Sequence, residues 1–239
     1  MSILSTDFHT HILPGIDDGS KNVSDSVRMI QMEQRQGVER IVLTPHFHAQ
    51  HINPEIFIQK REAAMQQLQD ALFSEPIVPS FILGAEVSYC PGMSKWESLE
   101  LLTIGDTRCL LIEMPAKEWN ERVLSELEAI HYDRGITPII AHVERCFHPI
   151  RLNVLLRRLS QLPVLFQMNC SFLNSKRTRK LALKIISEHN IHILGSDCHS
   201  SVWRNPDIDS ARNLLIENLD KRTISFLSEF EQMVIQGRL

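Results

Sequence analysis

Histidine and acidic side chains open this sequence at a spacing that could hold a metal ion. Asp7, His9 and His11 alternate with other residues in a stretch that follows a short hydrophobic lead-in. Because alternate side chains of a β-strand project to the same face, we expect all three to point together, with two imidazoles able to bind one divalent cation. Pro14 and Gly15 interrupt the pattern next, which places His11 where the strand ends.

Further candidates follow later hydrophobic runs in the same way. The whole set has five histidines and four carboxylates: His9, His11, Asp18, His46, Glu86, Glu113, His142, Asp197 and His199. Crowded at one end of a fold, the carboxylates would repel one another and be driven toward protonation, so we expect two or three divalent cations to balance them. Nitrogen and oxygen ligands without thiolate suit manganese, iron or zinc. Ions ~3.5–4 Å apart would convert a bridging water into a hydroxide nucleophile near neutral pH.

Two arginines stand close to these candidates in the sequence. Arg145 comes three residues after His142, and Arg204 comes five residues after His199. A planar guanidinium can bind two phosphate oxygens at once, so the pair predicts an anionic substrate, most simply a phosphate ester. The ordinary alternative is that each arginine, like most surface arginines, is only solvated.

The hydrophobic pattern around these residues predicts strands and helices in alternation. Strands are expected at residues 3–11, 38–43, 77–87, 108–114, 137–145, 164–169 and 191–194, and helices at 24–36, 54–73, 118–134, 150–162, 178–189, 208–219 and 223–235. For the first helix, Ser24 is the expected cap and Gly37 the stop. Alternation of this kind is typical of a parallel sheet covered by helices. Because polar clusters follow nearly every strand, a closed barrel of seven strands is favoured over an open sheet.

Length, charge and cysteine content narrow the class of protein. One barrel fits 239 residues, so we predict a single domain over residues 1–239. With 25 basic against 29 acidic residues, the net charge of −4 gives no overall positive field for nucleic acid, although residues 175–180 form a local basic run. No apolar run approaches the ~20 residues that cross a bilayer, and no secretory leader opens the chain, so we expect a cytoplasmic protein without membrane insertion. Five scattered cysteines predict free thiols.

Seven motifs, in order, resemble the polymerase and histidinol phosphatase (PHP) superfamily. They are Asp7-Phe8-His9-Thr10-His11, the loop through Asp17-Asp18-Gly19, Thr44-Pro45-His46, Gly84-Ala85-Glu86, Leu111-Ile112-Glu113, Ile140-Ala141-His142-Val143-Glu144-Arg145 and Ser196-Asp197-Cys198-His199. The sequence is most similar there to the bacterial metal-dependent protein-tyrosine phosphatases encoded with capsule and exopolysaccharide genes. The resemblance implies an α/β fold, a distorted seven-stranded (β/α)7 TIM-like barrel. It also implies three divalent ions, often Mn2+, and hydrolysis of phosphotyrosine on a partner tyrosine kinase.

The resemblance also implies a role for each site residue. One ion would be held by His9, His11, Glu86 and Asp197, a second by Glu86, Glu113 and His142, and a third by Asp18, His46 and His199. Arg145 and Arg204 would bind the phosphoryl group, and together with Asp18 they would be the catalytic residues. Asp7 would orient a ligand histidine by hydrogen bonding. Asp17 is an alternative to Asp18, and His48 an alternative to His46. No general acid is assigned.

Other activities compete with this interpretation. Histidinol phosphatase and nuclease activities occur in the same superfamily, although a nuclease would need a broad basic groove. Cys198 and Arg204 have the Cys-x5-Arg spacing of cysteine-dependent tyrosine phosphatases, but no glycine lies between them for a loop whose backbone amides cradle phosphate. A catalytically silent metal-binding scaffold for a kinase is the alternative of another class. The oligomeric state stays open.

Overall fold

Nine short parallel strands form the centre of the computed structural model, which describes residues 3–73, 75, 78–115, 119–146, 159–188 and 190–239. One sheet has the order β1-β2-β4 and the other the order β3-β5-β6-β7-β8-β9. The strands are β1 (Thr6–Thr10), β2 (Arg40–Leu43), β3 (His46–Phe47), β4 (Ser80–Leu83), β5 (Glu86–Ser88), β6 (Cys109–Glu113), β7 (Thr137–Ile140), β8 (Leu165–Asn169) and β9 (Ile193–Gly195).

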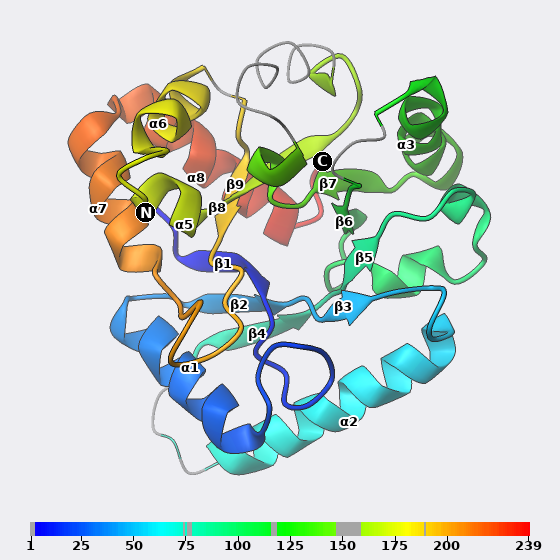
Figure 1. The fold of residues 1–239 in the computed structure, drawn as a ribbon, viewed down its shortest axis with the longest axis horizontal. Helices are drawn as coiled ribbons and strands as arrows, with labels where there is room; N and C mark the ends of the chain where they lie inside the picture. Colours follow the sequence, from blue (N-terminus) through cyan, green and yellow to red (C-terminus); the bar gives the residue numbers. More distant parts are fainter. Residues whose placement is uncertain (1–2, 74, 76–77, 116–118, 147–158, 189) are drawn as a thin grey trace.

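Helices alternate with these strands along the chain and surround them in space (Figure 1). The predicted α/β class with parallel strands is therefore confirmed. None of the helices in the described ranges is long and apolar enough to span a bilayer. The α-helices are α1 (Val23–Arg35), α2 (Pro54–Leu72), α3 (Glu121–Arg134), α5 (Cys170–Asn174), α6 (Arg179–Ser187), α7 (Ile208–Asn218) and α8 (Lys221–Ile235), and the 3-10 helices are η1 (Met93–Lys95), η2 (Leu99–Leu102) and η3 (Val143–Cys146).

Asparagine side chains fix where three of the helices begin. The Asn22 side chain accepts a hydrogen bond from the backbone N–H of Asp25 at 3.0 Å, so the cap of α1 is Asn22 and the prediction of Ser24 was wrong. Asn53 and Asn120 cap α2 and α3 in the same way. Each cap satisfies a backbone donor that the first helical turn leaves without a partner.

Several predicted boundaries differ from the structure. The strand expected at 38–43 appears as β2, and after a break at Pro45 the chain forms a separate short strand, β3. The strand expected at 77–87 is interrupted at Gly84 and appears as two strands, β4 and β5. Proline lacks the N–H that a ladder needs, which explains the first break. The strand expected at 137–145 ends at Ile140, because His142 has a φ of 30° and turns the chain into η3. Helix α5 was not predicted, and most of the helix expected at 150–162 lies outside the described residues.

The first and last strands lie side by side although the whole chain separates them. The Asp197 N–H donates to the carbonyl of His9 at 2.8 Å, and the His11 N–H donates to the carbonyl of Cys198 at 3.0 Å. Thr10, the last residue of β1, forms a parallel bridge with Cys198, which comes three residues after β9 ends. These bonds place the histidines at the end of β1 directly beside the acidic turn that follows β9.

Two apolar layers hold the strands in position. The larger layer packs the helices against the outer faces of the strands, with Ile41, Leu110 and Phe166 among its fully buried members. A smaller cluster draws on strands of both sheets and on α8, so the sheets curl around a shared interior: Phe8, Val42, Ile104, Cys109, Leu111, Ile139, Ala141, Leu165, Ile193 and Val234. Because buried apolar packing tolerates little movement, the polar ends of the strands have fixed relative positions.

Candidate metal centre

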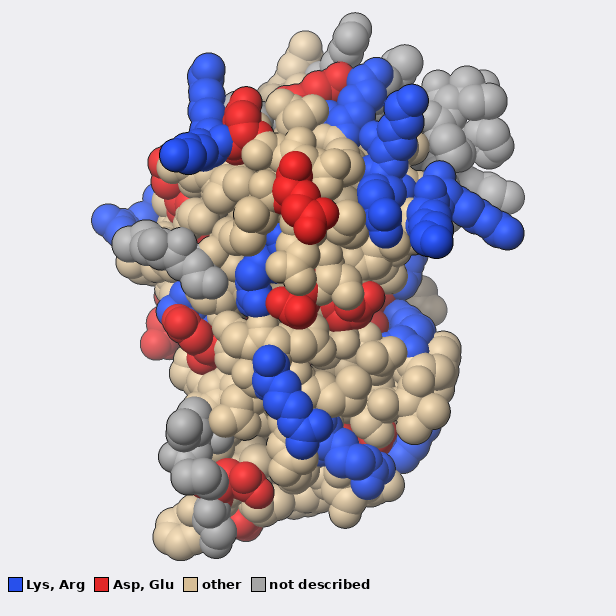
Figure 2. Space-filling model, turned by 90° about the vertical axis from the view of Figure 1, so that its left-hand side faces the viewer, with Lys and Arg blue, Asp and Glu red and all other residues tan. Residues whose placement is uncertain are grey.

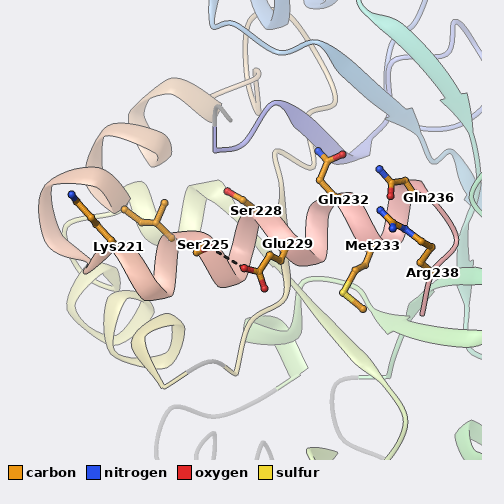
Figure 3. A pocket seen from close by; sticks show the side chains of 9 residues that line it. Lys221, Ser225, Ser228, Glu229, Gln232, Met233, Gln236 and Arg238 are labelled. Carbon is orange, nitrogen blue, oxygen red and sulfur yellow. Dashed lines mark hydrogen bonds between the residues drawn. The ribbon is translucent and has the colours of Figure 1, made fainter.

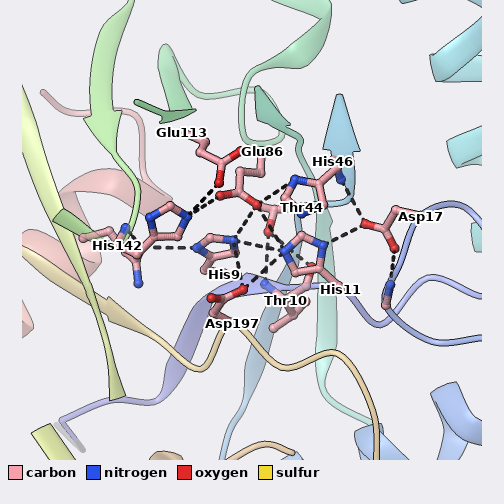
Figure 4. Close-up of polar contacts among 12 residues, drawn as sticks. His9, Thr10, His11, Asp17, Thr44, His46, Glu86, Glu113, His142 and Asp197 are labelled. Atoms are coloured by element: carbon pink, nitrogen blue, oxygen red, sulfur yellow. Dashed lines mark hydrogen bonds and ion pairs between the residues drawn. The ribbon is translucent and has the colours of Figure 1, made fainter. Parts of the chain in front are cut away.

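The structure brings all nine predicted ligands into one connected cluster. Figure 4 labels seven of them, all except Asp18 and His199. His9 lies on β1, His46 on β3, Glu86 opens β5 and Glu113 closes β6. The others follow β1, β7 or β9 in loops and turns: His11, Asp18, His142, Asp197 and His199. Seven of them lie at or after the end of a parallel strand, and His46 and Glu86 open short strands that come three residues after β2 and β4 end. Barrel folds keep their chemistry at this end of their strands.

Glu86 lies at the middle of the cluster and is fully buried. Its Oε2 atom is 3.1 Å from His9 Nε2, 3.2 Å from His11 Nε2 and 3.1 Å from His46 Nδ1. Its Oε1 atom is 2.8 Å from His142 Nε2. A carboxylate that reaches four imidazoles with two oxygens has the geometry of a bridge between neighbouring metal ions.

Three groups of ligand atoms within this cluster are compact enough to surround an ion. In each group the ligand atoms all lie within 4.8 Å of one another: His9, His11 and Glu86; His46, Glu86 and Glu113; and His11, Asp18, His46 and His199. Two buried nitrogen atoms inside these groups, His46 Nδ1 and His199 Nε2, make no hydrogen bond to a described residue. Buried polar atoms without partners are costly, and divalent cations would satisfy them, so these residues fit metal ions.

Asp18 and Asp17 occupy different places around the cluster. Asp18 Oδ1 lies 3.6 Å from His46 Nε2 and 3.5 Å from His199 Nε2. Asp17 Oδ2 accepts hydrogen bonds from His11 Nδ1 at 2.7 Å and from the His46 backbone N–H at 2.9 Å. Asp18 therefore faces the ligand atoms, whereas Asp17 lies behind His11 and fixes the orientation of its ring.

His46 and His48 also separate in space. The ring of His46 contacts Glu86, whereas His48 Nδ1 is 2.7 Å from the hydroxyl of Ser88. That hydroxyl donates to Glu113 Oε2 at 3.2 Å. His46 thus lies within the cluster, and His48 reaches it only through Ser88.

Asp7 does not share the face of the two histidines that follow it. The pairing of β1 with β2 has an irregularity between Asp7 and Thr10, and such a bulge changes which side chains share a face. Asp7 Oδ1 accepts hydrogen bonds from the backbone N–H groups of His9 at 3.1 Å and Ser196 at 2.9 Å. Asp7 therefore fixes the backbone that carries the ligands and not an imidazole ring, and the expectation of a common face was wrong.

Both predicted arginines converge on one carboxylate oxygen. Arg204 contacts Asp197 Oδ2 at 2.7 Å, and Arg145 bonds the same atom. The Arg145 side chain is 47% exposed and that of Arg204 is 31% exposed, so both keep surface open to solvent. Arg204 and Asp197 have positive φ values of 49° and 55°, which are rare for non-glycine residues and are often found at functional sites.

The imidazoles of the cluster lie next to its carboxylates, and each kind of group shifts the pKa of the other. Burial acts to raise the pKa of Glu86, but the charge of His9 and hydrogen bonds from other imidazoles hold it well below its usual range. The pKa of Asp197 is also lowered, against burial. Burial acts to lower the pKa of His11, yet hydrogen bonds to Asp17 and Glu86 raise it to about 10. For Glu86 and Asp197 the pKa shift is therefore opposite to the expected drive toward protonation, because imidazoles and arginines supply the compensating charge. Bound cations would replace imidazolium protons.

Sequence reasoning missed the residues that support the cluster from behind. Gln167 Oε1 lies 3.2 Å from His9 Nδ1 and accepts the backbone N–H of His142 at 2.6 Å. Asn169 donates its amide N–H to Asp197 Oδ2 at 2.7 Å. Gln167 and Asn169 stand two residues apart in a predicted strand, so their amide side chains share one face of it. Because buried amides need polar partners, this spacing was the sequence signal for a supporting role.

Cys198 lacks the surroundings of a reactive thiol. It is fully buried, and burial raises its pKa well above the usual range, with the charges of Glu33 and Asp7 acting in the same direction. A nucleophilic cysteine needs a lowered pKa and access to substrate. The Cys-x5-Arg spacing is therefore a chance match.

Other surface features offer less for chemistry. A hollow of 740 Å³ beside α8 is lined by residues such as Lys221, Glu229 and Arg238, with no histidine or cysteine among its described lining residues (Figure 3). Lys and Arg side chains gather at one upper edge of the face in Figure 2, but acidic side chains are interspersed across that face. No broad basic groove for nucleic acid is visible on it.

A second hollow of 770 Å³ opens beside the histidine cluster. It is lined by Asp17, Asp18, His46 and Glu113 and extends to the start of α2. Another hollow, of 420 Å³, borders the cluster at Glu113, His142 and Arg145. A ligand could reach the candidate metal centre from either of these cavities.

Comparison with known proteins agrees with this geometry. A family model described as capsular polysaccharide synthesis, CpsB/CapC, matches residues 5–233. The chain is 30% identical to tyrosine-protein phosphatase YwqE of Bacillus subtilis, over 97% of this chain and 92% of that protein. It is 27% identical to tyrosine-protein phosphatase CpsB of Streptococcus agalactiae serotype V, over 90% and 91% of the two chains.

Solved structures give the same result for the fold. A crystal structure from a study of YwqE from Bacillus subtilis and CpsB from Streptococcus pneumoniae, described as unique metal-dependent tyrosine phosphatases, superposes with a TM-score of 0.86. It has 26% sequence identity and covers 98% of this chain and 95% of that one. A TatD family hydrolase of Entamoeba histolytica, at a TM-score of 0.54 and 11% identity over 98% of both chains, shares the fold alone.

Proposed function

The chain belongs to the CpsB/CapC family of capsular polysaccharide synthesis, and from this premise we propose that it is a metal-dependent protein-tyrosine phosphatase. The observation that carries the proposal is the buried carboxylate of Glu86 among four imidazoles, with two arginines at the edge of the same cluster. Relatives over most of the chain bear the name tyrosine-protein phosphatase.

We assign the ions to three sets of side chains. His9, His11, Glu86 and Asp197 would hold one; Glu86, Glu113 and His142 a second; Asp18, His46 and His199 a third. The separations within each set lie between 2.8 and 3.7 Å. The compact groups described above differ from these sets, because they place His46 with Glu86 and Glu113, and His11 with Asp18, His46 and His199. Mn2+ is our first choice, with iron or zinc as alternatives, since imidazole and carboxylate ligands suit all three. When bound, the ions would supply an activated water and neutralise phosphoryl charge.

The protein's own groups position the substrate. Arg145 and Arg204, partly exposed and anchored on Asp197, would each offer N–H groups to the phosphoryl oxygens. Asp18 has a side chain that is 66% exposed, so it can face both the cluster and an incoming phosphoryl group. Asp17 and Gln167 hold the rings of His11 and His9 in one orientation, which keeps the ligand nitrogens directed inward.

For the fold we propose a distorted barrel of seven strands and a single domain over residues 1–239. If β3 continues β2 and β5 continues β4, the nine segments become seven. The hydrogen bonds between β1 and β9 support closure of the ring. We further propose a cytoplasmic location, in keeping with five free cysteines, and a tyrosine kinase of capsule or exopolysaccharide synthesis as the phosphoprotein substrate.

One assay tests the function directly. The purified protein should hydrolyse a phosphotyrosine peptide with added Mn2+, and a chelator should abolish turnover reversibly. Metal analysis should find about three ions per chain. Turnover of histidinol phosphate in preference to the peptide would favour the histidinol-phosphatase alternative, and metal binding without hydrolysis of any phosphoester would identify a scaffold.

A further inference from the structure

The hollow beside the metal centre is larger than the reaction centre itself requires. Its 770 Å³ continue from Asp18, His46 and Glu113 along residues 48–53 to the first turns of α2. Because it shares these residues with the cluster, a ligand that occupies it is in contact with the site of chemistry. Cavities of roughly 300–1,000 Å³ hold ligands well above the size of one amino-acid side chain.

The outer part of this groove has an apolar wall. Ile16, Ile52, Ile56 and Phe57 line it, from the loop after β1 and from the start of α2. Ile56 is 49% exposed and is one of the few large hydrophobic side chains on the described surface with so much area open to water. Exposed apolar side chains that border a functional cavity are typical of a binding surface.

The same part of the groove is also basic in character. Lys60 and the imidazoles of His48 and His51 line it, and Lys60 and His51 are exposed. The carboxylates among the described lining residues, Asp17, Asp18 and Glu113, all lie at the end of the groove that meets the metal centre. Among the described residues that line it, the outer end therefore offers one cationic lysine, two imidazoles and apolar side chains, and no carboxylate.

We propose that this groove binds the polypeptide on one side of the phosphotyrosine, with an apolar residue against Ile56 and an acidic residue at Lys60. The proposal rests on the proposed function and refines it, because it makes the preferred substrate an acidic peptide segment and not a small phosphate ester. A free phosphate ester would fill only the inner end of the groove. A peptide would bury surface along the whole length of the groove.

Two surface variants and two matched controls test the groove. Ile56→Ser removes the exposed apolar contact, and Ile216→Ser, on α7 with 54% exposure, is its control. Lys60→Gln removes one positive charge, and Gln67→Glu, exposed on the same helix but not lining the groove, changes the charge by the same amount. All four positions are exposed, so folding is preserved.

The measured quantities are KM and kcat for an acidic phosphotyrosine peptide and for p-nitrophenyl phosphate. Ile56→Ser and Lys60→Gln should each raise the peptide KM about fivefold and leave kcat and the small ester unchanged, whereas the controls should match the unmodified protein. The rise for Lys60→Gln should shrink at high salt. Fluorescence anisotropy of a labelled peptide, with chelator present to prevent turnover, should show the same loss of affinity.

The outcomes separate the two proposals. If the unmodified protein hydrolyses both compounds but the groove variants match their controls, the groove is not a peptide site and the phosphatase assignment stands. An equal loss with the small ester would also overturn the groove, because the variants would then act on the metal centre. If neither compound is hydrolysed with Mn2+, the proposed function and the groove inference both fail.

Discussion

Glu86 contacts four imidazoles, whereas Glu113 contacts one. Glu113 Oε1 lies 3.5 Å from His142 Nε2, and its side chain is 32% exposed. The difference in burial means that loss of charge at Glu86 cannot be compensated by water. The two acidic residues should therefore differ in their effect on metal binding.

Exchange of Glu86 for Gln should remove the centre of the cluster while it preserves side-chain shape. We expect kcat to fall about 100-fold or more and the metal content to decrease, because the shared ligand is lost. Mass-spectrometric metal analysis and steady-state kinetics give the measurement, with Glu113→Gln as the milder comparison. A Glu86→Gln protein that keeps its full complement of Mn2+ would contradict the assignment.

Exchange of Cys198 for Ala should leave the chemistry intact. The thiol is fully buried and does not line either cavity beside the cluster, so kcat should stay within about twofold while the free energy of unfolding falls by about 1 kcal/mol. Kinetics and urea unfolding test both statements. A collapse of activity with unchanged metal content would revive the cysteine mechanism.

At the level of residues, strand ends were enough to find all nine candidates. The sequence could not separate Asp17 from Asp18, since both follow the same loop and only the turn at Gly19 decides which one faces His46. The alternation of Gln167 and Asn169 shows that two amides share one strand face, but it does not show which residues they support. Their partners lie on other strands, and no local pattern encodes that distance.

The contact between β1 and β9 depends on the absence of a side chain at Gly195. A Cβ atom there would lie 2.6 Å from His9 Cβ and 2.8 Å from the His9 backbone nitrogen. At Gly84, where φ is also ordinary, a Cβ would meet its nearest neighbours at 3.4 Å. A Cβ atom therefore does not fit at Gly195, whereas it nearly fits at Gly84.

Gly195→Ala should therefore separate the first and last strands. We expect a loss of about 1–3 kcal/mol in the free energy of unfolding and about 10-fold or more in metal affinity, because His9 moves away from Asp197. Gly84→Ala is the matched control and should retain both. Urea unfolding and calorimetric titration with Mn2+ are the measurements, and equal behaviour of the two variants would refute the argument.

His192 links α8 to the strands and makes the fold sensitive to acid. Its ring packs against Phe226 and Phe230, with centroids 5.9 and 4.7 Å away, and Nδ1 accepts the Phe166 N–H at 3.0 Å. Burial lowers the pKa of His192 from 6.5 to about 4. The neutral ring therefore favours the folded state above pH 6.5, and this advantage declines as the pH falls toward 4.

The expected loss through His192 is up to roughly 3 kcal/mol, since each pKa unit is worth about 1.4 kcal/mol. His192→Gln keeps an acceptor for the Phe166 N–H but cannot titrate. The variant should show a flatter decline in urea midpoint between pH 6.5 and 4 than the unmodified protein. His51→Gln, an exposed position, should keep the original slope.

Elements were predicted best where the hydrophobic pattern was long. Helices α2 and α3 appear close to their expected bounds, because an asparagine cap and an apolar stripe mark each one. The breaks at Pro45 and after Ile140 were harder to see. Both breaks occur next to a candidate ligand, His46 or His142, where the backbone conformation that directs the imidazole into the cluster is not that of a strand.

Taken as a whole, the molecule has an apolar framework that does not depend on metal ligands. Neither apolar layer includes a candidate metal ligand, so the metal-free protein should remain folded. Added Mn2+ at about 100 times its dissociation constant should contribute about 2.7 kcal/mol per site. The Tm should therefore rise by roughly 5–10 °C for one saturated site, with unchanged far-UV circular dichroism.

Thermal scans with Mn2+ and with chelator measure that shift, and Glu86→Gln should show less of it. A metal-free protein that loses its secondary structure would contradict the independence of framework and centre. A Tm that does not change when Mn2+ is added would contradict the proposal that the cluster binds this ion.

The bonds between β1 and β9 also set an order of events in the cell. His9 and His11 leave the ribosome before their neighbours Asp197 and His199, which emerge about 190 residues later. Contacts so distant in sequence form late in folding. The cluster can therefore assemble only once the chain has been made past residue 199, and a shorter product carries the histidine pair without Asp197 beside it.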